Sequence, residues 1–251
     1  MRQFLLKLFS KKSTALTNKD CWEFTKPFMD ENIELKKRIQ ENRPVEEKWE
    51  TYWNNRRPKI NQVYKRQETD GTYEIDVRNY FMPFDVNIPI VEGKTNDEKA
   101  LNALKLVIST IKYTPDKEDY GYDEYWAYPY QTLKRKKGDC EDGAILIANI
   151  LIRSNVPYWR IRLNAGSVKG GGHCYATYCR ETDNQWVILD WCYWANLTPI
   201  KDRKKHSDEQ NYSDKSRNFY IWFSWNQKYC FGNMDTMASM PKRRFKNKDT
   251  T

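Results

Sequence analysis

Hydrophobic and polar positions in the middle of the chain follow a helical period. After a capping signal at Thr95 or Asn96 and acids in the first turn, apolar residues recur three and four positions apart until Pro115. These residues are Leu101, Leu104, Ile108 and Ile111. The spacing places them on one face, so the pattern predicts an amphipathic helix that begins at this cap and ends before Pro115.

A second helix is predicted in KKGDCEDGAILIANILI, residues 136–152. Asp139 is a good N-cap, and Asp142, three residues later, is suited to the return half of a capping box. Asn155-Val156-Pro157 closes the helix. This places Cys140 at the first helical position. The predicted apolar face consists of Leu146, Ile147, Ile150 and Leu151.

The pattern then changes to β-prone runs. These are YWRIRLNA (158–165), HCYATYCR (173–180) and QWVILDWCYW (185–194), and the last two are joined by the polar connection ETDN. NFYIWFSWNQKYCF (218–231) reads as a further strand or strand pair. Helices followed by antiparallel strands predict an α+β fold, with the Cys140 helix packed on an antiparallel sheet.

The domain organisation expected from these patterns has three parts. Residues 1–94 form an N-terminal extension with a basic arm, helices and a hairpin around the Asp70-Gly71 turn signal. A boundary is expected near Gly93. The main domain then covers residues 95–235, and residues 236–251 form a basic tail.

Composition and charge narrow the class of protein. An aromatic content of 15% excludes wholesale disorder. The net charge is +9, and residues 201–251 carry 12 Lys/Arg against 6 Asp/Glu, whereas residues 95–200 carry 13 of each. A nucleic-acid partner is not expected, because no recognised binding motif accompanies the basic ends.

The sequence also bears on where the chain is made. It contains no apolar stretch long enough for a membrane span and no signal-peptide pattern at its start. No membrane partner is therefore expected. The expectation is cytoplasmic synthesis with free thiols for the six cysteines, and incorporation into a virion if the chain is phage-encoded.

Candidate chemistry centres on Cys140. A helix N-terminus lowers a thiol pKa, but Glu141 and Asp142 oppose this, so a thiolate needs a cationic partner such as an imidazolium. Of the two histidines, His206 lies in a charged loop and is expected to be solvated. His173 follows three glycines and is the better candidate, although an ordinary strand histidine after a glycine-rich turn is the competing interpretation.

Asp190 supplies a third group. It is the one carboxylate in a strongly apolar strand, where burial without a partner would be costly. If the ETDN turn pairs the two strands, residue 190 opposes a residue near 173 to 175, within reach of a hydrogen bond from His173. The alternative is a strand-end carboxylate facing water. Together, Cys140, His173 and Asp190 fit the general pattern of a nucleophile, a base and an orienting acid.

A zinc site built from the cysteines is not expected. Successive strand residues face opposite sides, so Cys192 would join His173 and Asp190 while Cys174 points away, and Cys179 lies opposite Cys174. The chain also has no paired CxxC signature.

The blocks YPYQTLKRKKGDCEDGAILIANILIRSNVP, GGGHCYATY and WVILDWCYW, in this order, resemble the transglutaminase-like superfamily, closest to its bacterial and phage cysteine peptidase branch. The resemblance covers roughly residues 95–200 and implies a papain-like, transglutaminase-like core. It implies that Cys140 is the nucleophile, His173 the base and Asp190 the group that orients the base. The family often has Glu at the position of Gln131 in this chain. We consider the Gln131 side-chain amide as a hydrogen-bond donor to the oxyanion.

Three functions remain open at this point. The first is a thiol-dependent amide hydrolase acting through a thioester on a protein or peptide, with no metal or organic cofactor. The second is a transamidase using the same triad, and the third is a component that docks into a larger, phage-type assembly through residues 1–94. The substrate groove is expected to include Trp126, Tyr128, Gly171, Gly172 and Trp191.

Overall fold

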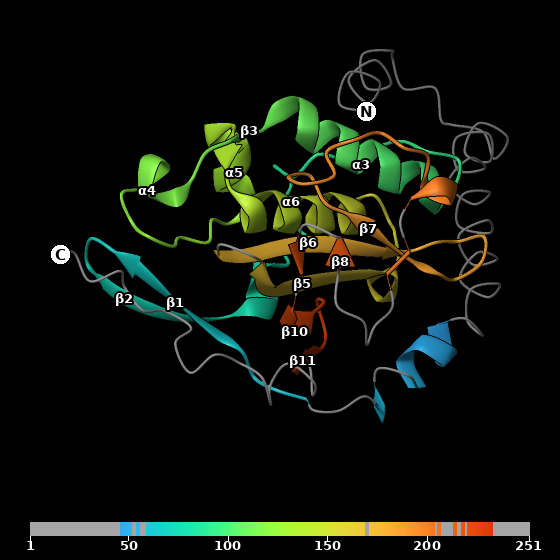
Figure 1. Ribbon diagram of the computed structural model, residues 1–251, viewed down its shortest axis with the longest axis horizontal. Helices are drawn as coiled ribbons and strands as arrows, with labels where there is room; N and C mark the ends of the chain where they lie inside the picture. The colour runs from blue at the N-terminus through green and yellow to red at the C-terminus, as the bar shows by residue number, and fades with distance from the viewer. Residues whose placement is uncertain are drawn as a thin grey trace, which may run out of the picture. The chain divides into compact units, whose positions relative to one another are not determined.

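The computed structural model describes residues 46–51, 54–55, 59–168, 171–203, 205–206, 213–214, 217–218 and 220–232 (Figure 1). Contacts divide the chain into two units, Met1–Thr51 and Tyr52–Thr251. In the first unit only residues 46–51 are described, and they are helical. The predicted basic arm, the helices before residue 46 and the basic tail lie outside the described residues. Within the described part of the chain, no helix is both long and apolar enough to span a membrane.

A five-stranded antiparallel sheet forms the centre of the second unit. Its strand order is β11-β10-β5-β6-β7. The strands are β5 (Ile161–Val168), β6 (Gly171–Cys179), β7 (Trp186–Leu189), β10 (Tyr220–Trp225) and β11 (Cys230–Gly232). All the predicted runs form strands, and the last run forms a pair. Strand β7 is shorter than predicted because the chain turns away from the sheet after Leu189.

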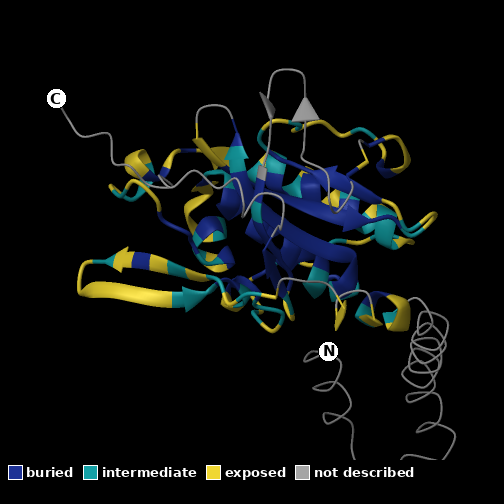
Figure 2. Ribbon diagram, turned by 60° about the horizontal axis from the view of Figure 1, so that its bottom comes forward, coloured by how far each residue is buried: buried dark blue, intermediate teal, exposed yellow. Residues whose placement is uncertain are grey.

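Helix α6 (Cys140–Arg153) packs against β5 and β6, and α3 (Asn96–Thr110) packs on α6. Both begin where the sequence predicts. Thr95 caps α3 by accepting a hydrogen bond from the Glu98 N–H at 3.1 Å. Every residue of α6 from Glu141 to Leu151 is buried, so this helix is enclosed on all sides, and Figure 2 shows the sheet beside it in the buried colour. The predicted α+β fold, a helix on an antiparallel sheet, is confirmed.

Short elements connect these layers. They are η1 (Val77–Tyr80), β3 (Lys112–Tyr113), α4 (Asp116–Asp119), α5 (Pro129–Arg135), β4 (Lys137–Gly138), η2 (Tyr158–Arg160), η3 (Ile200–Asp202), β8 (Ser213–Asp214) and β9 (Arg217–Asn218). Strands β3 and β4 pair in parallel, directly before the start of α6. The loop that brings the chain to Cys140 is therefore hydrogen-bonded to the segment that follows α3.

The predicted hairpin forms as β1 (Val63–Glu68) and β2 (Gly71–Asp76), with its turn at Thr69 and Asp70. It contacts the aromatic loop before α5: the Tyr64 hydroxyl donates to the Glu124 carbonyl at 2.9 Å, and the Tyr125 hydroxyl donates to Glu68 at 2.8 Å. The hairpin therefore belongs to the same compact unit as the sheet, and no division of contacts occurs at the boundary predicted near Gly93.

Asn149 ties the segment after η1 to the middle of α6. Its Oδ1 accepts the Met82 N–H at 2.6 Å, and its Nδ2 donates to the Tyr80 and Ile145 carbonyls, both at 2.9 Å. The side chain is fully buried. Asn149 thus satisfies the Met82 N–H and the Tyr80 carbonyl, which belong to a segment that forms no strand with the sheet. Buried backbone groups without a hydrogen-bond partner would lower the stability of the fold.

We expect Asn149→Ala to lower the free energy of unfolding by about 2 to 4 kcal/mol, because it leaves the Met82 N–H and the Tyr80 carbonyl without their partner. Urea unfolding followed by tryptophan fluorescence measures this. Asn102→Ala is the matched control, since this exposed helical asparagine only donates to the Glu92 carbonyl. An equal loss of unfolding free energy in both variants would contradict the structural role of Asn149.

Candidate active site

Cys140 is the first residue of α6, as predicted, and its backbone is fixed by Trp191. The Trp191 Nε1 donates to the Cys140 carbonyl at 3.1 Å. Its indole ring lies so close to Gly143 that a Cβ at that position would collide with it. A glycine one turn into the helix therefore allows the chain after β7 to lie against the helix start. This contact brings the segment that follows Asp190 next to Cys140.

His173 and Asp190 form the predicted hydrogen bond. The His173 Nε2 lies 2.8 Å from the Asp190 Oδ2, and both side chains are almost fully buried. The strand register pairs Ala176 with Leu189, which places Asp190 beside residue 175, within the predicted range. The other carboxylate oxygen accepts the N–H groups of Cys192 and Tyr193, at 2.8 and 3.1 Å. Asp190 is therefore held firmly as an acceptor for the imidazole.

The Cys140 thiol lies next to the strand that carries His173. A hydrogen bond from the backbone N–H of Cys174 lowers the thiol pKa, but burial and the neighbouring Asp139 outweigh it, so the pKa of Cys140 lies well above its usual value. The Sγ also lies 3.3 Å from the Glu141 Oε2 and donates to it. This environment favours the neutral thiol of Cys140 over the thiolate.

An acidic cluster lies at the start of α6, and sequence reasoning did not foresee it. One carboxylate oxygen from each of Asp116, Asp139, Glu141 and Asp142 lies within 4.8 Å of the others. Each of the four has one buried oxygen with no hydrogen-bond partner among the described residues. Burial raises the pKa of all four carboxyl groups, that of Asp116 to about 8. The signal in the sequence is the DCED run, but Asp116 comes from α4, 23 positions before Asp139.

Such a cluster is suited to a hard divalent cation. Ca²⁺ binds carboxylate oxygens and tolerates irregular geometry, and buried carboxylates without a counter-charge are otherwise unfavourable. The set of four oxygens fits this chemistry. We therefore regard the acidic cluster as the part of the site that could hold a metal.

The predicted capping interactions are rearranged. Asp139 occupies the N-cap position of α6 but makes no side-chain capping hydrogen bond, so the predicted box with Asp142 lacks its first half. Asp142 instead accepts the Ala127 N–H at 2.8 Å. Gln131 closes a capping box on α5, where its Oε1 accepts the Tyr128 N–H at 2.9 Å. This contact gives Gln131 a structural role, and its role as an oxyanion donor stays a prediction.

The residues predicted to line a groove lie in different surroundings. Trp126 is buried and stacks between Tyr64 and Trp225, at ring-centroid distances of 5.0 and 5.6 Å, so it is a core residue. Tyr128 is half-buried and contacts Tyr80. Gly171 and Gly172 are exposed at the start of β6, and Trp191 is buried against α6.

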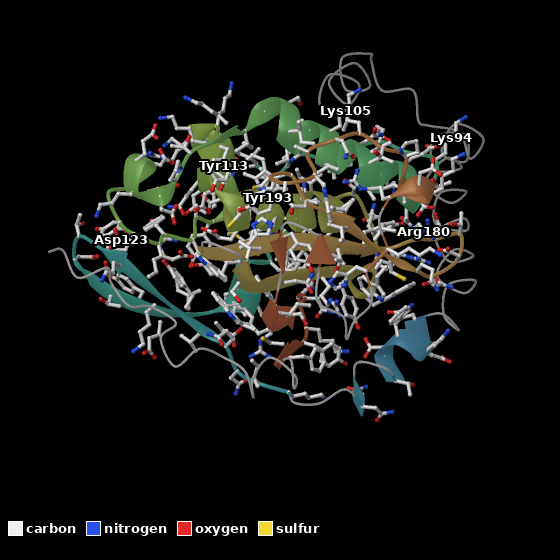
Figure 3. The ribbon with its side chains drawn as sticks, in the orientation of Figure 1. Lys94, Lys105, Tyr113, Asp123, Arg180 and Tyr193 are labelled. Atoms are coloured by element: carbon white, nitrogen blue, oxygen red, sulfur yellow. The ribbon has the colours of Figure 1, made fainter. Side chains whose placement is uncertain are left out.

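Two exposed tyrosines border the site, and the sequence did not single them out. Tyr113 is 51% exposed, and its ring lies 5.9 Å from that of Trp191. Tyr193 is 40% exposed, and its ring lies 4.4 Å from that of His173. Both are labelled in Figure 3. They are the large side chains that a ligand of Cys140 would meet on these two sides.

His206 is not solvated, which corrects the sequence-based expectation. It is buried, its Nε2 lies 2.6 Å from the Tyr175 hydroxyl, and its backbone N–H donates to the Trp186 carbonyl. Burial, with the nearby Arg162, lowers the pKa of His206 well below its usual value. The loop appears hydrophilic in sequence, but an edge contact with β7 draws this part of it inward.

Comparisons with known proteins find similarity to the middle of the chain. A family model described as a transglutaminase-like domain matches residues 85–200. A UPF0252 protein of Methanocaldococcus jannaschii is 28% identical over 130 residues, which is 48% of this chain and 36% of that protein. A UPF0252 protein of Pyrococcus horikoshii is 38% identical over 96 residues, which is 38% of this chain and 27% of that protein. The chain thus spans about a third of the length of these curated relatives.

Among solved structures, Legionella pneumophila LapG is similar. The EGTA-treated form has a TM-score of 0.43 and 16% identity, covering 58% of this chain and 71% of LapG. The calcium-bound form has a TM-score of 0.38 and 18% identity, covering 57% and 81%.

The family match contains all three sequence blocks on which the resemblance rests, including Cys140, His173 and Asp190. The same segment supplies the buried helix and strands β5, β6 and β7 of the sheet. The predicted resemblance is confirmed by this match: residues 85–200 of this chain are similar to a transglutaminase-like domain.

Proposed function

We propose that this domain is a thiol-dependent amide hydrolase of the cysteine peptidase type, with Cys140 as nucleophile, His173 as base and Asp190 as the group that orients the base. The observation that carries the proposal is the buried 2.8 Å contact between His173 and Asp190 beside a cysteine at a helix N-terminus. A hydrogen-bonded pair of this kind, next to a nucleophile, fits the logic of a catalytic triad.

The proposed reaction begins from a neutral thiol. Because Asp190 accepts from Nε2, the basic nitrogen of His173 is Nδ1. It takes the thiol proton as the sulfur attacks the amide carbonyl carbon, and the free N–H groups at the start of α6 suit the oxyanion. The imidazolium then gives its proton to the leaving amine. Water hydrolyses the resulting thioester, which releases the acid and restores the thiol.

A transamidase is the second candidate, since an amine in place of water would resolve the same thioester. The third, docking into a larger assembly, was based on residues 1–94, of which residues 1–45 lie outside the described part. The His173–Asp190 pair is buried and suited to general base catalysis, which favours either enzyme over a docking component.

The proposal also includes a divalent cation, Ca²⁺ being the best match, at the acidic cluster. Asp116, Asp139, Glu141 and Asp142 would hold it. This differs from the sequence-based expectation of no metal. A bound cation would supply positive charge next to Cys140, which would lower the thiol pKa. It would also remove the repulsion among four buried carboxylates.

Alkylation of Cys140 tests the Cys–His pair. We expect iodoacetamide to modify Cys140 faster than the buried Cys174, Cys179 and Cys230, at a rate that still rises between pH 7 and 9 because the thiol pKa is raised. The His173→Ala change should slow the alkylation of Cys140 at pH 7.5 about tenfold or more. Mass spectrometry of each cysteine measures the rates.

His206→Gln is the matched control, because it removes the other histidine and keeps a polar partner for Tyr175. This change should leave the alkylation rate of Cys140 within about twofold of the wild-type rate. If His173→Ala alkylates as fast as wild type, the two residues do not work as a pair.

Product analysis tests the reaction. A peptide digest incubated with the wild-type protein should acquire new N-termini. A digest incubated with the Cys140→Ala variant should acquire none. Asp190→Asn should be about 10³ to 10⁴ times slower, because the wrong imidazole tautomer is favoured, whereas Asp183→Asn, in the turn after β6, should be unaffected. If dansylcadaverine is incorporated and no new N-termini form, the domain is a transamidase and not a hydrolase. Products of equal yield with Cys140→Ala would exclude both.

The cation is tested by stability against pH. A carboxyl group with a raised pKa binds more protons folded than unfolded, so in EGTA we expect the free energy of unfolding to fall between pH 5 and pH 8. Saturating CaCl₂ should flatten this slope and raise the Tm at pH 8 by about 5 °C or more. Thermal unfolding by circular dichroism measures both.

Asp116→Asn should raise the Tm in EGTA at pH 8 and remove most of the Ca²⁺ response, since its amide oxygen can still accept the Tyr125 N–H. Asp123→Asn removes an exposed carboxylate outside the cluster, so Ca²⁺ should raise the Tm of this variant as it does for wild type. If Ca²⁺ leaves the wild-type Tm unchanged at pH 8, the cluster holds no cation.

A further inference from the structure

A group of exposed cations lies on the elements that lead to Cys140. The basic patch, as we define it, consists of Lys112, Lys134, Arg135, Lys136 and Lys137, all exposed. It is continuous across two segments, because β3 and β4 pair Lys112 with Lys137 and the Lys112 N–H donates to the Lys136 carbonyl at 3.0 Å. The segment 129–138 contains no acidic residue.

Most of this positive charge is uncompensated. Arg135 pairs with Asp119, and Lys137 lies 4.0 Å from the same carboxylate. No ion pair is found for Lys112, Lys134 or Lys136 within the described residues. Of the acidic cluster, Asp116, Glu141 and Asp142 are buried, so these carboxylates contribute little to the surface charge. The charged residues of the segment 129–138 are therefore all basic and exposed, although residues 95–200 as a whole carry equal numbers of acids and bases.

Lys136 has a backbone conformation that its side chain disfavours. It is the C-cap of α5 with φ of 55°, the left-handed region where glycine is the usual residue. A lysine at this position costs local stability that glycine would avoid. Residues held in this way often serve a function, and here the strained residue is one of the uncompensated cations.

The patch adjoins the catalytic residues. Lys112 directly precedes Tyr113, the exposed ring that packs against Trp191, and Lys137 is three residues before Cys140. A polypeptide bound across Cys140 on this side would therefore pass from the nucleophile over Tyr113 to the patch. Tyr113 and the helix start lie in the same region of Figure 3.

We propose that the basic patch binds an acidic segment of the protein substrate, next to the amide that Cys140 attacks. Aspartate or glutamate side chains would pair with the free lysines at the rim of the site, where such pairs mainly guide and select the partner. The proposal rests on the proposed function for its choice of a polypeptide. A nucleic acid is the rival ligand, but its backbone contains no amide bond for Cys140 to attack, and the described residues contain no recognised nucleic-acid-binding motif.

Binding is measured with a fluorescein-labelled peptide of twelve glutamates by anisotropy, in Cys140→Ala protein and 50 mM salt. The patch variant is Lys134→Gln/Lys136→Gln/Lys137→Gln. The matched control, Lys65→Gln/Lys94→Gln/Lys201→Gln, removes the same charge from exposed lysines elsewhere. We expect the Kd to rise about tenfold or more in the patch variant and less than about twofold in the control.

Three results would overturn the proposal. They are equal weakening in both variants, absence of binding by the parent protein, and tighter binding of a labelled dT12 oligonucleotide, which would assign the patch to nucleic acid. Because Cys140→Ala cannot react, none of these depends on amide hydrolysis. Conversely, peptide binding that holds while His173→Ala leaves Cys140 alkylation unchanged would keep the patch and refute the proposed function.

Lys136→Gly separates charge from folding. Glycine relieves the left-handed backbone, so the Tm should rise by about 2 °C while the peptide Kd increases several-fold. In protein with Cys140 present, the acidic peptide should also slow alkylation of Cys140, and a peptide of twelve glutamines should not. A Lys136→Gly variant that gains stability and keeps its affinity would remove Lys136 from the binding surface.

Discussion

The enclosure of the first turn of α6 is the constraint on which the site depends. Glu141 and Asp142 cannot turn toward bulk water, because α3, the sheet and the Trp191 segment surround this helix, and Cys140 at its start is only partly exposed. The loop before α5 is fixed to the same turn through Asp142 and Ala127. The thiol, the strand that carries His173 and the chain after Asp190 therefore meet at one place.

This enclosure has an electrostatic consequence. A helix N-terminus favours negative charge, yet burial acts more strongly here and keeps both the thiol and its neighbouring carboxyl groups toward their neutral forms. The proposed chemistry accordingly uses a base that works during attack and a cation that compensates the acids. The same burial removes Glu141 and Asp142 from the surface, whereas Lys112, Lys134 and Lys136 face solvent with no ion pair among the described residues. One packing arrangement thus shapes both the reactivity of Cys140 and the charge that a substrate would meet.

Much of the fold follows from local pattern. The cap at Thr95, a hairpin turn around Asp70, Cys140 at the first helical position and the strands of the sheet were all predicted. Caps, turns and periodicity act between residues close in sequence. The register across the ETDN turn even predicted the contact of His173 with Asp190. Predictions that required distant partners were less successful. His206 is buried by an edge contact with β7, and Trp126 stacks with rings from β1 and β10.

The residue pattern alone therefore predicted the two long helices, the strands of the main sheet, the family resemblance and the three residues proposed to react. What surrounds these residues depends on contacts between distant segments. Asp116 reaches the DCED run through α4, and the cations of β3 and β4 gather on one surface through a strand pairing that their sequence separation hides. The reason is physical: hydrogen-bonded periodicity is local, whereas burial, and with it the charge state of Cys140 and its neighbours, depends on which distant segments exclude water.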